Sequence, residues 1–237
     1  MPESVTFGPD PERLAALAEF AAGAGHEINN PLATIIGRAG QLLRDEQDPQ
    51  RQHALSIIAA QSYRIRDMIG DVMAFARPPA LVPTQVDLVR LVREAVEKFR
   101  SASTPDSPVV ELELPPSLDF SLDANQWVVV VEELLRNARE ASNPEPVKIR
   151  VSLIGDVAGC RLEISDDGRG FSELERQHAF DPFFSGRQAG RGLGFGLCKV
   201  WRIVQLHGGD IQIQSTANRT TIRVSLPQTP ESTARVS

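Results

Sequence analysis

The sequence predicts a two-domain protein in which an all-α helical hairpin precedes an α+β two-layer sandwich. Three observations support this fold class. Apolar residues recur at helical spacing over two long stretches before residue 77, prolines cluster at residues 78–83, and short strand and helix patterns alternate afterwards. A chain of 237 residues, of which 41% are hydrophobic, is long enough for two cores. We therefore expect a hairpin domain over residues 1–76, a linker over 77–87, a larger domain over 88–227 and a polar tail over 228–237.

The two helices of the hairpin have matching start signals. Asp10-Pro11 and Asp48-Pro49 each combine an N-cap residue with a proline suited to the first turn. Two antiparallel helices cannot bury their apolar stripes alone, so we expect a homodimer with a four-helix bundle. The first stripe, which continues to about residue 43, contains Leu14, Ala21, Ile28, Ile35 and Leu42, with Ala18, Leu32 and Ala39 alongside. The second contains Leu55, Ile58, Ser62, Ile65, Ile69, Val72 and Ala76.

The larger domain reads as alternating short elements. We expect helices at residues 88–100, 124–141 and 196–207, and strands at 109–114, 119–122, 147–154, 161–165, 211–215 and 221–226. Residues between 165 and about 194 read as loops. With strands on one side and helices on the other, these elements form two layers.

Composition excludes several classes of protein. The net charge of −6 is spread along the chain without a basic block, which argues against nucleic acid as a partner. No run of 18 apolar residues and no signal peptide occur, so we expect no membrane contact by these residues and a cytoplasmic location. About ten residues precede the first helix, too few for a sensory domain, so a sensor or membrane anchor would have to lie upstream of this chain. Cys160 and Cys198 are isolated and read as reduced core thiols.

His26 stands out in the first helix because it lies off the apolar stripe. At about 100° per residue, it is about 160° around the helix from Ile28, and Asn30 shares its face. Pro31 removes a backbone N–H and should loosen or kink the helix beside it. The plain alternative is an ordinary surface histidine. A zinc-protease helix is excluded, because position 30 would have to be a second histidine.

Three further segments carry polar or glycine patterns typical of nucleotide sites. Glu133 and Asn137 are four residues apart on one helix face and offer the oxygen ligands that Mg²⁺ prefers, although a solvated polar face is the alternative. Asp166 ends a strand before the glycine turn of residues 167–170. A buried carboxylate at this position could accept a hydrogen bond from the exocyclic amine of adenine. Taken alone, such a turn is common.

The third segment is the glycine-rich stretch at residues 190–197, which leads directly into a helix. Exposed backbone N–H groups and a helix N-terminus favour phosphates. The stretch lacks the Lys-Ser/Thr ending of a Walker loop and the preceding strand of a dinucleotide site. A flexible glycine loop is the alternative interpretation.

Together these motifs resemble those of two-component sensor histidine kinases. His-Glu-Ile-Asn-Asn-Pro-Leu, residues 26–32, is similar to the phosphoacceptor box, His-Glu-x-x-Asn-Pro-Leu. Residues 133–141, 164–171 and 190–197 resemble the N, G1 and G2 boxes, and residues 180–184 resemble the F box. The resemblance covers residues 11–226 and implies the ATP-binding fold of histidine kinases, gyrase, heat-shock chaperones and mismatch-repair ATPases, with a lid at about residues 180–192.

The resemblance also implies residue roles. His26 would accept the phosphoryl group, Glu27 would take the imidazole proton, and Asn30 would position water for dephosphorylation of a response regulator. The residues expected to bind ATP and Mg²⁺ are Glu133 and Asn137 at the metal, Asp166 at adenine, and Gly168, Gly170, Phe180, Arg187, Gly192, Leu193, Gly194 and Gly196 around the nucleotide. The usual Thr-Thr-Lys after the F box is replaced by Ser185-Gly186-Arg187, which keeps a positive charge with a different geometry.

The implied function is ATP-dependent autophosphorylation of His26, followed by transfer to an aspartate of a response-regulator receiver domain. Dephosphorylation of the regulator is a second implied activity. Two alternatives stay open at this point. One is a dimeric scaffold that senses ATP without transferring phosphate, suggested by Arg187, and the other is an ATP-hydrolysing clamp of the chaperone or gyrase type.

Overall fold

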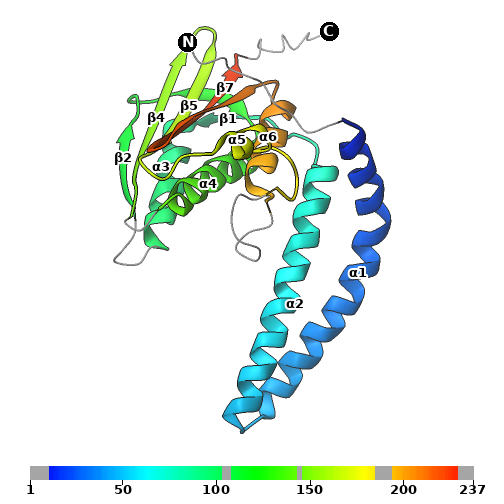
Figure 1. The fold of residues 1–237 in the computed structure, drawn as a ribbon. Coiled ribbons are helices and arrows are strands. Elements are labelled where there is room, and N and C mark those ends of the chain that lie inside the picture. The colour runs from blue at the N-terminus through cyan, green and yellow to red at the C-terminus, as the bar shows by residue number, and fades with distance from the viewer. Residues whose placement is uncertain (1–10, 103–107, 143–145, 185–193, 229–237) are drawn as a thin grey trace. The chain divides into compact units, whose positions relative to one another are not determined.

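The computed structural model describes residues 11–102, 108–142, 146–184 and 194–228. The chain divides into two compact units, with the boundary between Pro79 and Ala80. The first unit holds two long helices, and the second holds the strands and shorter helices (Figure 1). This is the fold class that the sequence predicts. Each predicted element is present, with ends within two residues of the predicted ones.

The first unit is an antiparallel pair of helices, α1 Pro11–Asp45 and α2 Pro49–Ala76 (Figure 1). The predicted cap of α2 is confirmed, since the Asp48 side chain accepts the Gln50 N–H at 2.8 Å. Asp10, the predicted cap of α1, lies outside the described residues. Helix α1 continues through Pro31 and curves along its length, as expected for a helix that lacks one backbone donor.

Only part of each predicted apolar stripe is covered within one chain. Leu32 and Ala39 of α1 are buried, as are Ser62 and Val72 of α2. The side chains that stay exposed on the same two helices include Ile35, Leu42, Ile57, Ile58 and Ile65. A single hairpin therefore leaves a row of large aliphatic side chains in contact with water.

The second unit is built on a mixed five-stranded sheet in the order β2-β4-β5-β7-β6. Strands β2 and β4 are parallel, and the other pairs are antiparallel. Strands β1 and β3 form a separate antiparallel pair. The bounds are β1 Thr84–Asp87, β2 Val109–Glu113, β3 Asp119–Leu122, β4 Lys148–Asp156, β5 Gly159–Asp166, β6 Asp210–Thr216 and β7 Arg219–Pro227.

Three helices cover one face of this sheet: α3 Leu88–Ser101, α4 Ala124–Glu140 and α6 Gly196–Leu206 (Figure 1). Alternate residues of β5 and β7, such as Leu162, Ile164 and Val224, point into the core between the layers. Trp127 and Leu134 meet them from α4 and are almost fully buried. Cys160 and Cys198 are buried and are not joined in a disulfide, as expected for reduced core thiols.

His207 connects the end of α6 to the start of α4. Its Nδ1 lies 2.8 Å from the Ile203 carbonyl oxygen, and its Nε2 lies 3.2 Å from the Asp123 backbone nitrogen. A carbonyl only accepts and a backbone N–H only donates, so in these two contacts Nδ1 is the donor and Nε2 the acceptor. Asp123 in turn caps α4 by accepting the Gln126 N–H at 3.1 Å. The two helices that carry the candidate site are thus fixed to each other.

Two elements were not predicted. Strand β1 lies within residues 77–87, which the sequence analysis assigned to the linker, and it pairs with β3 from Thr84↔Leu122 to Asp87↔Asp119. Residues 84–87 are therefore part of the second unit, which is a correction to the linker. Helix α5 Glu173–Gln177 occupies part of the segment expected to be loop. Among the described helices, none combines the length and apolar character that crossing a bilayer requires.

Candidate functional site

Glu133 and Asn137 lie on one face of α4, as the spacing predicts. Glu133 is 6% exposed, and Asn137 is partly exposed. The buried Glu133 carboxylate is satisfied by two cations. Lys199 Nζ, from α6, lies 2.7 Å from Glu133 Oε1, and Arg136 pairs with Oε2 from the next turn of α4. Neither cationic partner was predicted from the sequence.

Asp166 is the last residue of β5 and points to the inner face of the sheet, like Leu162 and Ile164 before it. It is 3% exposed, and its Oδ1 accepts the Gly168 N–H at 3.0 Å. Burial raises the pKa of the Asp166 carboxyl to about 6. The structure thus places an acidic acceptor in an apolar setting, where a hydrogen bond to a ligand amine gains strength.

The glycine turn after Asp166 is held by α4 on one side and by the β6-β7 hairpin on the other. The Arg169 N–H donates to the Ala141 carbonyl at 3.1 Å, just past the end of α4. A Cβ on Gly168 would lie 2.6 Å from that same carbonyl oxygen. Gly170 has φ +70° and fits against the backbone carbonyl of Thr216. Only glycine meets both requirements of close approach and positive φ.

An ion pair that the sequence analysis missed supports this turn from the outside. Arg169 contacts both carboxylate oxygens of Glu175, at 3.1 and 2.6 Å. Glu175 also accepts the Ser172 N–H at 2.8 Å, while Ser172 Oγ accepts the Glu175 N–H at 3.2 Å. The hydrogen bonds from Arg169 lower the pKa of Glu175 to about 2, against the effect of burial. The spacing Ser172-x-x-Glu175 is a capping-box signature, which could have predicted helix α5 and the reciprocal hydrogen bonds between Ser172 and Glu175.

The described residues that flank positions 185–193 contact each other. Phe180 is buried in the hydrophobic core, whereas Phe183 is exposed, has φ +65° and lies edge-on to the Phe195 ring at 4.7 Å between centroids. Gly194, with φ +69°, packs against the carbonyl of Phe184. The expected nucleotide-binding residues Arg187, Gly192 and Leu193 lie outside the described residues.

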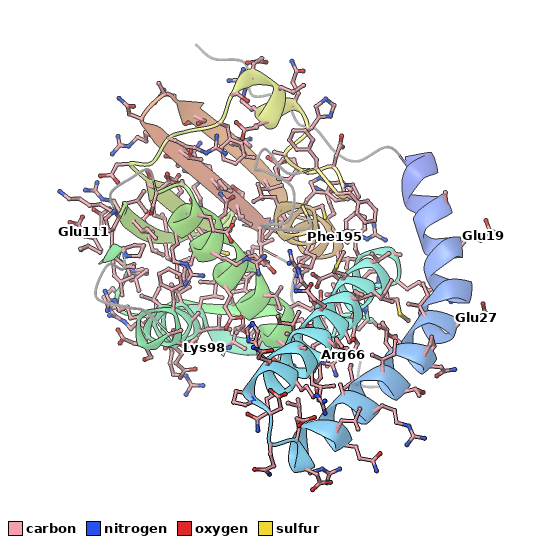
Figure 2. The ribbon with its side chains drawn as sticks, turned by 60° about the horizontal axis from the view of Figure 1, so that its bottom comes forward. Glu19, Glu27, Arg66, Lys98, Glu111 and Phe195 are labelled. Carbon is pink, nitrogen blue, oxygen red and sulfur yellow. The ribbon has the colours of Figure 1, made fainter. Side chains whose placement is uncertain are left out.

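Gly196 begins α6 and faces the Glu133 ion pair. A Cβ at this position would lie 3.0 Å from Glu133 Oε2 and 3.1 Å from Arg136 Nη2. These contacts bring the glycine stretch, α4 and the turn after β5 to one region of the second unit. Figure 2 shows Phe195 at the start of α6 and Lys98 on α3.

The donor atoms of this region suit a nucleotide with magnesium. Glu133 supplies a carboxylate and Asn137 an amide oxygen, both hard donors, and two such side chains leave room for waters and phosphate oxygens. Asp166 supplies the buried acceptor that an adenine amine requires. In this arrangement the residues can bind and orient a nucleotide, and phosphoryl transfer needs an acceptor brought from elsewhere.

The predicted acceptor group lies in the other unit, on α1. Glu27 and Asn30 are exposed, and Figure 2 shows Glu27 on the side of α1 that faces away from α2. The backbone of His26 is helical, and its side chain lies outside the described part of the chain. Gly25 is buried, and a Cβ there would collide with Met73 Sδ of α2, so a larger residue at this position would require the Met73 side chain to move.

Comparison with known families identifies both units. The His Kinase A (phospho-acceptor) domain matches residues 16–80. The family described as Histidine kinase-, DNA gyrase B-, and HSP90-like ATPase matches residues 122–230. The chain belongs to the two-component sensor histidine kinases. The hairpin of this histidine kinase is its phosphoacceptor domain, and the sandwich is its ATPase-type domain.

The chain is similar to curated histidine kinases from several bacteria. It is 31% identical over 223 residues to the signal transduction histidine-protein kinase AtoS of Escherichia coli (strain K12). It is 34% identical over 231 residues to the sensory histidine kinase/phosphatase NtrB of Rhodobacter capsulatus. These alignments cover 93% and 91% of this chain but 36% and 62% of the relatives, so the chain spans less than two thirds of their length.

Solved structures agree on the fold. Full-length ShkA in complex with AMPPNP matches 89% of this kinase and 46% of its own chain, with a TM-score of 0.78 at 19% identity. The catalytic domain of histidine kinase ThkA matches 63% of this kinase and 98% of its own chain, with a TM-score of 0.57 at 26% identity. The two-domain fold predicted from the sequence is therefore confirmed.

Proposed function

We propose that this kinase binds ATP in the domain over residues 88–227, phosphorylates His26 in the hairpin domain over residues 1–76, and passes the phosphoryl group to an aspartate of a response-regulator receiver domain. The observation that carries the proposal is the convergence of α4, the turn after β5 and the first turn of α6. The Glu133–Lys199 ion pair and the Gly168–Ala141 contact join these three segments. They belong to the same chain as a phosphoacceptor hairpin.

Asp166 is proposed to hold the adenine base. Its carboxylate is buried at the C-terminal end of β5, where Oδ1 accepts the Gly168 N–H. The remaining acceptor capacity suits the exocyclic amine of adenine, and guanine would present a carbonyl at the same place. The pocket should therefore select ATP over GTP.

Asn137, Glu133 and the glycine stretch are proposed to hold the phosphates and their metal. Magnesium bound with ATP would neutralise phosphate charge at the leaving oxygens. Gly194 and Gly196 flank Phe195, the N-cap of α6, whose side chain does not cap the helix, and negative charge is favoured at a helix N-terminus. Arg187, Gly192 and Leu193 are assigned to the same pocket from the sequence. Arg187 would fork onto phosphate oxygens where the family usually has lysine.

His26 is proposed to attack the γ-phosphate as a neutral imidazole. A P–N bond forms, the bond from the γ-phosphorus to the bridging oxygen breaks, and ADP leaves. The ring proton passes to Glu27, which is exposed on the same turn of α1. Asn30, one turn further on, is proposed to orient water when the kinase dephosphorylates its regulator.

A homodimer through the hairpin is part of the proposal. Ile35 and Leu42 are seven residues apart on α1, as are Ile58 and Ile65 on α2, and all four are exposed in one chain. A second hairpin packed on these side chains would complete a four-helix bundle and bury them.

Retention of phosphate separates this proposal from its alternatives. With ATP and Mg²⁺, the kinase should form an acid-labile phosphoprotein and release little free phosphate, and His26→Gln should abolish the label without changing nucleotide affinity. An ATPase clamp would release phosphate over many turnovers in both proteins. A scaffold would bind ATP and form neither product.

A further inference from the structure

Glu133 has one cation on each of its two carboxylate oxygens. Lys199 Nζ is 2.7 Å from Oε1, and Arg136 Nη2 contacts Oε2. The Glu133 side chain is 7% exposed, so both ion pairs form out of bulk water, where charges interact strongly. With one negative and two positive groups, this cluster carries a net positive charge. A divalent cation cannot approach Glu133 closely while both partners stay in place.

The two cations differ in how firmly they are held. The Lys199 side chain is 15% exposed and comes from α6, across the α4–α6 contact. The Arg136 side chain is 45% exposed and comes from the same helix as Glu133. Arg136 also lines a hollow of about 230 Å³ whose other lining residues are Lys98, Phe99, Ala102, Val129, Glu132, Glu133 and Arg139. Arg136 therefore has an open hollow beside it, lined also by Glu132, into which its side chain can move, and Lys199 has less freedom.

We propose that Arg136 is an exchangeable cation, which pairs with the Glu133 carboxylate until magnesium arrives with the nucleotide and takes its place. Lys199 is then a positioning residue, which keeps the carboxylate oriented both before and after the metal binds. The inference rests on the proposed function, in which Glu133 supports the metal. Gly196 leaves this side of the ion pair uncrowded, because a Cβ there would lie 3.0 Å from Glu133 Oε2 and 3.1 Å from Arg136 Nη2. The exchange sets the Mg²⁺ concentration at which the site fills.

Removal of Arg136 should favour the metal. Arg136→Met takes away the competing charge, so the Mg²⁺ concentration for half-maximal binding of a fluorescent, non-hydrolysable ATP analogue should fall by about fivefold. Arg139→Met is the matched control. It removes the same charge from the same hollow, but the Arg139 guanidinium lies over the Phe99 ring, 5.3 Å from its centroid. The control should leave the Mg²⁺ midpoint within about twofold of wild type.

Removal of Lys199 should have the opposite effect. Lys199→Met leaves Glu133 without its fixed partner, so the Mg²⁺ midpoint should rise by about fivefold and the melting temperature in EDTA should fall. Lys199→Arg keeps the charge and should restore most of both values. If Lys199→Met does not fold, Lys199→Arg and the Arg136 variant still give the direction of the effect.

The outcomes distinguish a failure of the Arg136 exchange from a failure of the proposed ATP-binding function. If wild type binds the analogue and Arg136→Met leaves its Mg²⁺ midpoint unchanged or raises it, the exchange is wrong and the proposed function stands. A Lys199→Met protein that melts earlier with an unchanged midpoint would show a purely structural lysine and would also overturn the inference. If wild type does not bind the analogue at all, the proposed function and the inference both fail.

Discussion

The Asp166 carboxylate accepts the Gly168 N–H at 3.0 Å from a position that is 3% exposed. In the proposed function this buried carboxylate holds adenine, and its burial lowers the stability of the nucleotide-free protein at neutral pH. Burial raises the pKa of Asp166 to about 6, so the folded protein binds the proton of this carboxyl group more tightly than the unfolded chain does. The stabilisation that this protonated group provides is complete below pH 4 and is lost as the pH rises through about 6.

Asp166→Asn should separate these two effects. At neutral pH the free energy of unfolding of the nucleotide-free protein should rise by about 1–3 kcal/mol, because no buried charge has to form. Nucleotide affinity should fall at least about tenfold, because the charged acceptor is lost. Urea denaturation and nucleotide titration measure the two changes. For wild type, affinity should also decline below pH 6, where Asp166 becomes protonated. A destabilised Asp166→Asn protein with wild-type affinity would contradict this role.

The Arg169–Glu175 pair should hold the turn after β5. Arg169 keeps the pKa of Glu175 near 2, so the stability that the pair provides is present above pH 4.5 and is lost as the pH falls toward 2. Glu175→Gln should cost about 1–2 kcal/mol at neutral pH, a value reduced because the Arg169 side chain is 39% exposed. Glu173→Gln breaks the exposed pair with Arg176 in the same helix and should cost less than about 0.5 kcal/mol. Equal costs in thermal denaturation would argue against the prediction.

Gly170 should tolerate no side chain. It combines φ +70° with a close approach to the Thr216 carbonyl, so Gly170→Ala meets both strain and collision. Gly208 has the same φ of +70°, but a Cβ there would meet only Pro227, at 4.0 Å. We expect Gly208→Ala to cost about 1 kcal/mol and Gly170→Ala at least about 2 kcal/mol, with weaker nucleotide binding only in the latter. Matching effects of the two variants would show that the collision is relieved locally.

The exposed aliphatic row should be the dimer interface. Ile58 and Ile65 are 47% and 42% exposed in one chain, and the double variant Ile58→Lys/Ile65→Lys would place charges where a second hairpin packs. Sedimentation should show dimeric wild type and a monomeric variant. Val157→Lys is the control, because Val157 is an exposed aliphatic residue in the β4-β5 turn, at 98% exposure. A double variant that stays dimeric would place the interface elsewhere.

Local patterns in the sequence were sufficient to predict most of the fold. Periodicity and caps such as Asp48-Pro49 predicted the helices, and the Gly168–Gly170 turn predicted the end of β5. Strand β1 was missed because its four residues adjoin a proline-rich stretch and acquire strand structure only by pairing with β3. Which residues of each hairpin stripe are buried was also beyond the sequence, because in α2 the polar Ser62 is buried while the apolar Ile58 and Ile65 stay exposed.

The site was only partly predictable. Asp166, Glu133 and Asn137 were predicted as site residues from their type and spacing, and Glu133 and Asn137 do share one face of α4. The sequence did not reveal that Glu133 is already paired, because Lys199 reaches it from a helix distant in the chain. The Arg136 contact lies within one turn of α4, but an Arg three residues from a Glu is too common to single out.

The measurement that tests the central claim most directly is transfer of γ-labelled phosphate from ATP and Mg²⁺ to the purified protein, beside His26→Gln and Asn137→Ala. The account predicts label in wild type that is lost in acid and stable in base, and no label in either variant. His26→Gln should still bind ATP, since the acceptor lies outside the nucleotide domain. Label that persists in His26→Gln, or that survives acid, would contradict phosphorylation of His26 from this site.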